Sequence, residues 1–129
     1  MKKRLPEMCL LAVEAALEKK ADKVLILDVR GHCDYTSFIM LCHGEVPPQV
    51  QAIADSIMDK LKETAQLHHV EGYPQGRWIV LDYYDVVIHV FEEDLRYYYQ
   101  LENYWVEVPH WWFREDGTPI LMEPEPVRG

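Results

Sequence analysis

The first half of the chain shows one helical and two strand-like hydrophobic patterns. Across residues 5–17 the apolar side chains recur at spacings of three and four, which predicts an amphipathic helix. Residues 24–29 form a near-continuous aliphatic run, and residues 37–42 form a second run after the break at Gly31. Both runs have the length and composition of buried strands. A helix followed by two strands is therefore the expected beginning of the fold.

The second half opens with the strongest helical pattern in the sequence. Pro47 and Pro48 begin it, because proline is favoured in the first turn of a helix, and an apolar stripe follows for about four turns. That stripe consists of Val50, Ile53, Ala54, Ile57, Met58, Leu61 and Ala65. A short strand is expected around residues 69–71. A last helix is predicted from Glu93 to about Tyr104, with Leu95, Tyr98, Leu101 and Trp105 turned toward the body of the domain.

A β-hairpin is predicted over residues 77–91, after the turn-prone residues 72–76. If Asp82 and Asp85 flank a two-residue turn at Tyr83 and Tyr84, antiparallel pairing fixes the register of both strands. The expected pairs are Leu81 with Val86, Val80 with Val87, Ile79 with Ile88 and Trp78 with His89.

This register separates two faces of the hairpin, because successive side chains of a strand point to opposite sides. The aliphatic face is expected to belong to the core and comprises Ile79, Leu81, Val86, Ile88 and Val90. The other face, called the outer face below, comprises Trp78, Val80, Asp82, Asp85, Val87 and His89.

The outer face combines an aromatic anchor with negative charge, a composition suited to binding a basic protein surface. Asp82 and Asp85 would lie directly opposite each other, where like charges destabilise a sheet unless a partner neutralises them. The alternative is that Trp78 packs under a helix or under the C-terminal tail, and that the two aspartates are ordinary turn carboxylates.

The turn itself conflicts with its own sequence. A two-residue turn of type I′ needs positive φ at both central positions, which glycine or asparagine tolerates and tyrosine does not. Either the loop is wider than two residues, or Tyr84 adopts a strained backbone conformation.

The order of the elements predicts an α/β fold with a mixed β-sheet and flanking helices in a single domain over residues 1–109. The residues beyond Val108 contain four prolines and show no periodicity, so an irregular C-terminal extension is expected over residues 110–129. The aromatic cluster Trp111-Trp112-Phe113 is expected to dock on the domain, because large aromatic side chains are seldom left exposed; dimerisation or a partner contact are the alternatives.

Composition narrows the class of partner. The chain has 129 residues, of which 49% are hydrophobic, enough for one domain with a real core. Thirteen Lys and Arg stand against 22 Asp and Glu, for a net charge of −9, and no window gathers the positive charge that a phosphate backbone requires. Direct nucleic-acid binding is therefore not expected, whereas a basic protein partner suits the acidic surface.

The sequence also indicates a cytoplasmic protein. No secretory signal and no run of about 18 apolar residues is present, so no membrane association is expected. The cysteines, Cys9, Cys33 and Cys42, are odd in number and lack the spacing of a disulfide framework.

Two metal-site hypotheses can be weighed from the residues. Asp28, Asp82 and Asp85 could hold Mg²⁺ in a nucleotidyltransferase-like enzyme, but the paired carboxylates and Gly-Ser signature of that superfamily are absent. A zinc site from His32-Cys33 and Cys42-His43 is opposed by the strand of about 20 Å that separates the pairs. A buried Cys42 and a structural Cys33 are the expectation, with no cofactor and no metal.

The segment Trp78-Ile-Val-Leu-Asp-Tyr-Tyr-Asp-Val-Val-Ile-His-Val-Phe91 resembles the signature of the ribosomal silencing factor (Iojap-like) family, approximately W-x-L-L-D-Y-G-D-V-V-V-H-V-F. Further matches lie on both sides of it, over roughly residues 7–109. They are Asp28-Val-Arg-Gly31, Asp34-Tyr35, Gln49-Val50, Ala52 to Asp55, Val70-Glu71-Gly72, and Arg96, Tyr99, Leu101, Glu102 and Trp105 in the pattern R-x-x-Y-x-L-E-x-x-W.

The resemblance implies a small α/β domain with nucleotidyltransferase-like topology but without enzymatic activity, often a homodimer. It further implies binding to ribosomal protein fourteen of the large subunit, at the face that meets the small subunit, and repression of translation by blocking subunit joining. The expected partner-binding residues are Trp78, Asp82, Tyr83, Tyr84, Asp85, Val87 and His89. A homodimeric scaffold without ribosome affinity is the third class of function considered.

Two departures from the family pattern stand out. Tyr84 replaces the glycine of the turn and adds an aromatic ring at the expected interface. The family's T-G-T-S-S-R before the long helix is replaced by residues 42–48, so the hydroxyl N-cap and the arginine are lost.

Overall fold

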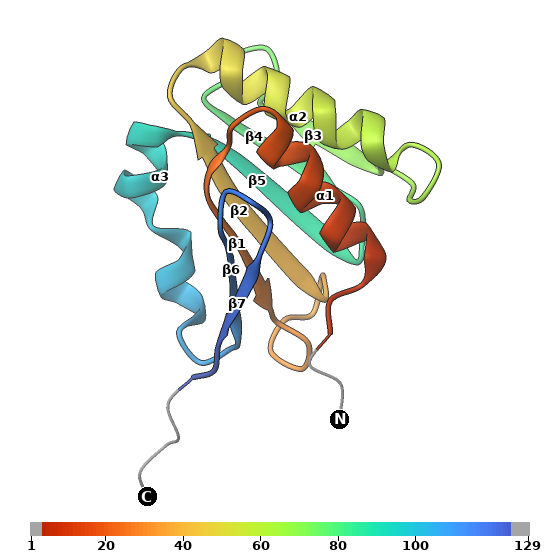
Figure 1. The fold of residues 1–129 in the computed structure, drawn as a ribbon, viewed down its shortest axis with the longest axis vertical. Coiled ribbons are helices and arrows are strands. Elements are labelled where there is room, and N and C mark those ends of the chain that lie inside the picture. Colours follow the sequence, from red (N-terminus) through yellow and green to blue (C-terminus); the bar gives the residue numbers. More distant parts are fainter. Residues whose placement is uncertain (1–3, 125–129) are drawn as a thin grey trace, which may run out of the picture.

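The computed structural model of the protein describes residues 4–124. Within this range seven strands form one sheet in the order β3-β4-β5-β2-β1-β6-β7, and helices lie on both of its faces (Figure 1). The elements are α1 (Glu7–Glu18), β1 (Asp22–Asp28), β2 (Phe38–Gly44), α2 (Pro47–Leu61), β3 (His69–Glu71), β4 (Trp78–Asp82), β5 (Val86–Glu92), α3 (Glu93–Tyr99), the 3-10 helix η1 (Leu101–Trp105), β6 (His110–Phe113) and β7 (Pro119–Met122).

The sheet is mixed, as the sequence predicts. Strands β2 and β5 are parallel, while the other neighbouring pairs are antiparallel. The parallel pair arises because α2, β3 and β4 intervene between β2 and β5 in the chain. The predicted α/β fold with flanking helices is confirmed.

Each face of the sheet has its own apolar cluster. Helices α1 and α2 cover one face, where Ile26, Met40, Ile79 and Ile88 pack under helical residues such as Ile53. Helices α3 and η1 cover part of the other face, which Figure 1 shows on the opposite side of the sheet. The cluster there joins Leu25, Leu27, Ile39, Leu41, Phe91 and Val108 to Trp78, Leu95, Leu101, Trp105 and Trp112. The central strands are thus buried on both faces, which explains their near-continuous aliphatic composition.

Helix α2 begins as the sequence predicts, with Pro47 and Pro48 in its first turn. Its N-cap residue Val46 makes no side-chain capping hydrogen bond, in agreement with the missing hydroxyl N-cap. The Gln49 side chain partly compensates: its Oε1 accepts a hydrogen bond from the Glu45 N–H at 2.7 Å, and its amide donates to the carbonyl of Lys19 at 3.1 Å. This glutamine ties the start of α2 to the end of α1.

The predicted last helix is divided in two. Gln100 has a φ of 46°, and this left-handed conformation ends α3 before η1 begins. Leu95, Leu101 and Trp105 pack against the sheet as expected, but Tyr98 is 78% exposed, so its predicted inward orientation is wrong.

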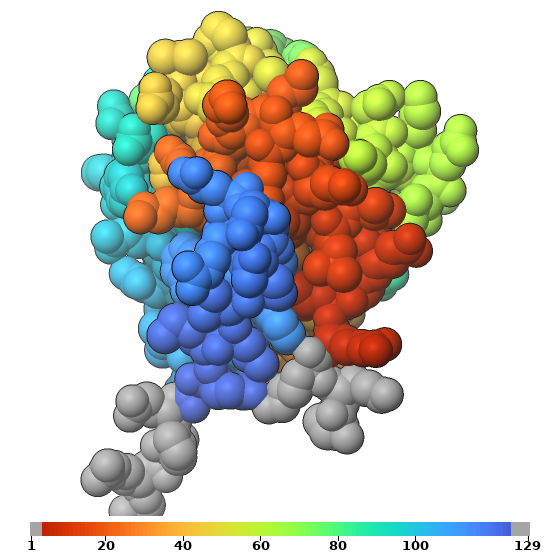
Figure 2. Space-filling view, viewed as in Figure 1, coloured from red at the N-terminus to blue at the C-terminus, as the bar shows by residue number. Residues whose placement is uncertain are grey.

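The prediction of an irregular extension from residue 110 is wrong for residues 110–122. Strand β6 pairs with β1, and β7 continues the sheet at its edge, beside α1 on the face seen in Figure 2. The aromatic cluster does dock on the domain: Phe113 is buried, and Trp111 and Trp112 pack against opposite faces of the sheet. The alternation of Trp111 and Trp112 between two apolar clusters is itself a strand pattern of period two, but it is too short to recognise in the sequence. Residues 125–129 lie outside the described part.

Candidate functional site

The β4–β5 hairpin has a register two residues away from the predicted one. Trp78 pairs with Phe91, Val80 with His89, and Asp82 with Val87. A shift of two preserves the faces, because side chains alternate with that period. The division into an aliphatic face and an outer face is therefore confirmed, although the individual pairs predicted from the sequence are wrong.

The shift arises at the turn, which is centred on Tyr84 and Asp85. The Asp82 carboxylate accepts a hydrogen bond from the Tyr84 N–H at 2.9 Å, and the Tyr83 N–H donates to the Val86 carbonyl at 2.9 Å. The Asp85 N–H closes the loop by donating to the Tyr83 carbonyl at 2.8 Å. Tyr83 thereby bonds to Val86 just beyond the last ladder pair, which joins Asp82 to Val87, so Asp82 and Asp85 do not lie opposite each other across the strands.

Tyr84 has a φ of 73°, so the strained conformation foreseen as one of two possibilities is the one observed. A bond from residue i+2 back to residue i, around a central residue with positive φ, is the geometry of a γ-turn. The Tyr84 ring lies against the His68 ring with 4.0 Å between centroids and a tilt of 33°, yet the residue remains 65% exposed. Together with the exposed Asp85 it forms an accessible aromatic and acidic tip.

Trp78 lies at the other end of β4, about 13 Å from Asp82 at ~3.3 Å per residue. Its ring contacts Phe91 at 4.8 Å and Tyr99 of α3 at 4.9 Å between centroids. Trp78 is therefore half-buried beneath α3, as in the alternative interpretation, and only part of its ring is accessible. The expectation of an open outer face is correct for the turn end and wrong for the Trp78 end.

His89 is held by that tryptophan. The Trp78 Nε1–H donates a hydrogen bond to His89 Nδ1 at 3.0 Å, which requires Nδ1 to be unprotonated. Burial lowers the pKa of His89 from 6.5 to about 4, so the ring is neutral at pH 7. It acts there as an apolar and hydrogen-bonding group and not as a cation.

The structure divides the seven candidate residues into three groups. Asp82, Tyr84 and Asp85 lie together at the turn, and Trp78 and His89 form a bonded pair at the α3 end. Tyr83 and Val87 are only 4% and 7% exposed, so their side chains offer little surface to a partner. A contact with the outer face would start from the turn group.

A buried charged cluster under α3 gives the site its shape, and the sequence reasoning did not find it. Arg96 is 3% exposed; its Nη1 lies 3.3 Å from His43 Nδ1, and its Nε lies 3.9 Å from a Glu102 carboxylate oxygen. Burial and the neighbouring Arg96 charge lower the pKa of His43. Arg96 thus connects α3, η1 and β2, and it holds α3 above Trp78. The sequence feature that could have indicated this cluster is the pattern R-x-x-Y-x-L-E-x-x-W, which contains both Arg96 and Glu102.

The three carboxylates of the metal-enzyme hypothesis do not converge. Asp28 is on β1 and Asp82 on β4, three strand spacings apart, or about 14 Å. Asp28 instead binds the Arg30 guanidinium at 2.7 and 2.9 Å. Burial alone would raise the pKa of Asp28, but the hydrogen bonds and charge of Arg30 lower it below its ordinary value. In the described residues, no group of three His, Cys, Asp or Glu side chains is arranged to hold a metal ion.

The cysteines occupy the positions expected of structural residues. Cys9 and Cys42 are fully buried, and burial raises the pKa of each thiol to about 12. Cys33 is half-buried and packs against the apolar cluster on the sheet face that α3 and η1 cover. In residues 4–124 no helix is both long and apolar enough for a membrane crossing.

Comparison with known proteins gives a consistent result. The family described as "Ribosomal silencing factor during starvation" matches residues 2–126. A protein of Halalkalibacterium halodurans named ribosomal silencing factor RsfS is 41% identical over 104 residues, covering 80% of this chain and 89% of the relative. The Bacillus subtilis protein of the same name is 40% identical over 100 residues, covering 77% and 85%.

Solved structures agree with the sequence relatives. A crystal structure of a Bacillus halodurans protein has a TM-score of 0.70 and 42% identity, and the match covers 77% of this chain and 93% of that one. Protein CV0518 from Chromobacterium violaceum has a TM-score of 0.74 and 33% identity, and the match covers 77% and 83%.

Proposed function

The chain belongs to the ribosomal silencing factor family, and from this membership we propose that it binds the large ribosomal subunit and represses translation. The partner is ribosomal protein fourteen, and the bound protein keeps the small subunit from joining. The bound protein acts by steric obstruction of subunit joining, without an enzymatic step. The match of the family over residues 2–126 is the observation that carries the proposal.

The turn group of the outer face is the proposed centre of the contact. Asp85 is exposed, Tyr84 is 65% exposed, and Asp82 fixes the turn through its bond to the Tyr84 N–H. An accessible aromatic ring between two carboxylates can pack against the stems of Lys or Arg side chains while the carboxylates pair with their charges. The net charge of −9 adds long-range attraction to a basic ribosomal protein.

Trp78 and His89 have a supporting role in this proposal. The neutral His89 accepts the Trp78 indole hydrogen, and the Trp78 ring in turn contacts Tyr99 of α3. They fix the position of α3 relative to the turn and contribute the accessible part of the indole to the interface. The homodimer implied by the family resemblance and the cytoplasmic location expected from the sequence belong to the same proposal.

Co-sedimentation with purified large subunits tests the contact. The double variant Asp82→Asn, Asp85→Lys removes one charge and reverses another, while asparagine can still accept the Tyr84 N–H bond. We expect binding to weaken by about tenfold or more, because charge pairs at the centre of an interface contribute on the order of 1–2 kcal/mol each.

The charge control is Glu45→Lys, at the opposite end of β2 from the hairpin turn. It changes the net charge in the same direction and should leave binding within about twofold of the parent protein. Equal weakening of binding by the control and by the turn variant would show that binding depends on net charge and not on the hairpin turn. Undiminished binding by the turn variant would exclude the proposed contact.

A further inference from the structure

A groove lies between α1 and the β6–β7 turn, away from the hairpin. It has a volume of about 540 Å³, and α1 forms one wall while residues 113–117 form the other. Figure 2 shows the two walls side by side on one face of the molecule. Strands β6 and β7 are at one edge of the sheet, whereas β4 lies next to the other edge. The groove is therefore separate from the outer face.

The floor of the groove is apolar. It is formed by Leu10, Leu11, Val13, Leu17 and Phe113. The Leu10 side chain is 47% exposed, although burial of a leucine side chain is favourable in free energy. Phe113 lies at the base of the groove and is 8% exposed. An open floor of this kind gains free energy when a second apolar surface covers it.

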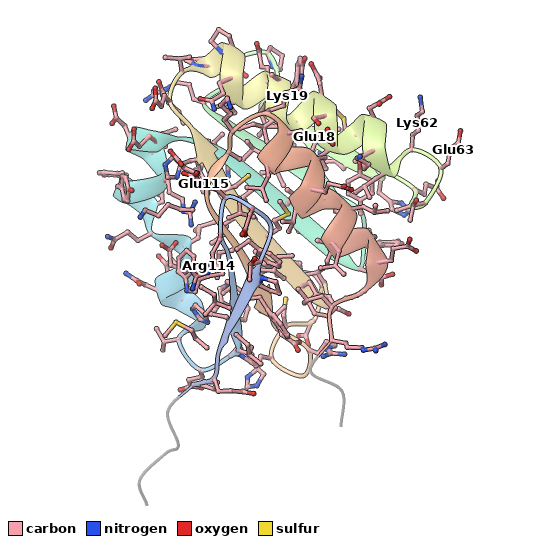
Figure 3. The ribbon with its side chains drawn as sticks, viewed as in Figure 1. Glu18, Lys19, Lys62, Glu63, Arg114 and Glu115 are labelled. Carbon is pink, nitrogen blue, oxygen red and sulfur yellow. The ribbon has the colours of Figure 1, made fainter. Side chains whose placement is uncertain are left out.

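The rim of the groove is strongly acidic. Five carboxylates border it: Glu7, Glu14, Glu18, Glu115 and Asp116. Figure 3 labels Glu18 at the end of α1 and Glu115 at the neighbouring turn. Lys60 pairs with Glu14 at 3.5 Å and with Glu18 at 3.4 Å, but among the described residues no cation pairs with Glu7 or Glu115. The negative charge at the mouth is thus only partly neutralised.

We propose that this groove binds a basic, amphipathic peptide segment of another protein, with apolar side chains on the floor and Lys or Arg side chains against the acidic rim. The charge pattern selects this occupant. The phosphates of a nucleic acid would be repelled by the carboxylates of the rim. A second copy of this chain would place one acidic rim against another and would be repelled as well. A peptide with alternating apolar and basic residues satisfies both features of the groove, because its strand-like side chains divide between floor and rim.

The test uses the full chain and a short fluorescein-labelled peptide in which leucine and lysine alternate, followed by anisotropy. Two comparison peptides replace lysine by aspartate or leucine by serine. The variants are Leu10→Asp and Glu115→Lys, both at exposed positions, so that the fold is retained. Glu107→Lys, an exposed position next to η1 that does not line the groove, is the matched charge control.

We expect saturable binding of the leucine-lysine peptide, at least about tenfold weaker binding by each groove variant, and at most a twofold change for Glu107→Lys. Both comparison peptides should bind at least tenfold more weakly. Absence of binding, equal weakening by Glu107→Lys, or undiminished binding by Leu10→Asp would overturn the proposal. A dimer in sedimentation velocity that dissociates on Leu10→Asp would also overturn it, in favour of self-association.

The result is independent of the proposed silencing function, because no ribosome is present in the assay. A protein that binds large subunits but not the peptide refutes only the groove. A protein that binds the peptide but not large subunits refutes only the silencing proposal.

Discussion

Tyr84 carries the main conformational strain of the hairpin. Its φ of 73° lies in the region that glycine occupies freely and that side chains with a Cβ occupy at a cost of about 1 kcal/mol or more. The contact of its ring with the His68 ring offsets part of that cost. The family signature has glycine at this position, so the exchange adds an aromatic ring to the tip of the hairpin at the expense of backbone strain.

Replacing Tyr84 by glycine and by alanine separates the two effects. Both variants lack the ring, but only alanine keeps the strained backbone, so Tyr84→Gly should be more stable than Tyr84→Ala by about 1 kcal/mol. Urea unfolding followed by tryptophan fluorescence measures the difference. Equal stability of the two variants, or greater stability of the alanine variant, would contradict the positive φ.

His89 predicts a specific dependence of stability on pH. Its pKa is lowered to about 4 in the folded protein and is 6.5 in its unperturbed state. Between these values the unfolded chain binds the proton more readily, so the contribution of His89 is present above pH 6.5 and is lost as pH falls toward 4. The parent protein should therefore lose more stability across this window than His89→Asn, by on the order of 2 kcal/mol.

Chemical denaturation at pH 7 and at pH 4.5 measures this difference. The variant retains a side-chain oxygen that can accept the Trp78 indole hydrogen, so the comparison isolates the titration. His43, whose pKa is also lowered, is present in both proteins and cancels. A parallel loss of stability in both would show that His89 is solvated and titrates normally.

At the scale of elements, β6 is the least expected part of the molecule. It pairs with β1 through Leu25, Ile26 and Leu27, and its side chains reach both apolar clusters. Without β6, strand β1 would be an exposed and strongly apolar edge, which is prone to pairing with other chains.

A chain that ends at residue 109 should therefore be less stable by several kcal/mol and should form higher oligomers. Urea unfolding and size-exclusion chromatography compare it with the full chain. Met122→Ala is the control, because this residue is 56% exposed in the outermost strand and should change stability by less than about 0.5 kcal/mol. A monomeric, equally stable chain of residues 1–109 would show that the domain ends where the sequence pattern suggested.

The elements differ in how well sequence predicts them, for physical reasons. Strands β1 and β2 and helix α2 can be predicted from the sequence because each has a long apolar run or stripe. Gly31 separates the two strands, and Pro47 marks the start of the helix. The predicted hairpin register differs from the observed one by two residues. The observed register depends on the hydrogen bond from the Tyr84 N–H to the Asp82 side chain, and the apolar pattern of the sequence does not indicate this bond. Strand β6 is four residues long, and its partner is distant in the chain.

The candidate site was only partly predictable for a related reason. The outer face follows from strand alternation, but its covering by α3 depends on the buried Arg96 between His43 and Glu102, which are far apart in the sequence. The residues that make up the outer face could therefore be predicted from the sequence, but their accessibility could not. The turn group Asp82, Tyr84 and Asp85 is the part that remains open to a partner.

At the scale of the whole molecule, the acidic domain presents two separate surfaces. The hairpin turn is at one end of β4 and β5, and the groove lies along α1 near the opposite edge of the sheet. Both combine accessible apolar or aromatic groups with carboxylates, so both favour basic partners. A ribosomal surface rich in basic proteins offers such partners, and the family assignment makes it the proposed target of the turn.

The proposal depends on obstruction of subunit joining, and joining can be measured directly. Purified large and small subunits are mixed at a magnesium concentration that favours joined ribosomes, with and without the protein, and the products are separated on sucrose gradients. The joined fraction should fall as the protein approaches the concentration of large subunits, and the Asp82→Asn, Asp85→Lys variant should restore it, while Glu45→Lys should act like the parent protein. A joined fraction that stays constant while the protein sediments with large subunits would contradict silencing by obstruction.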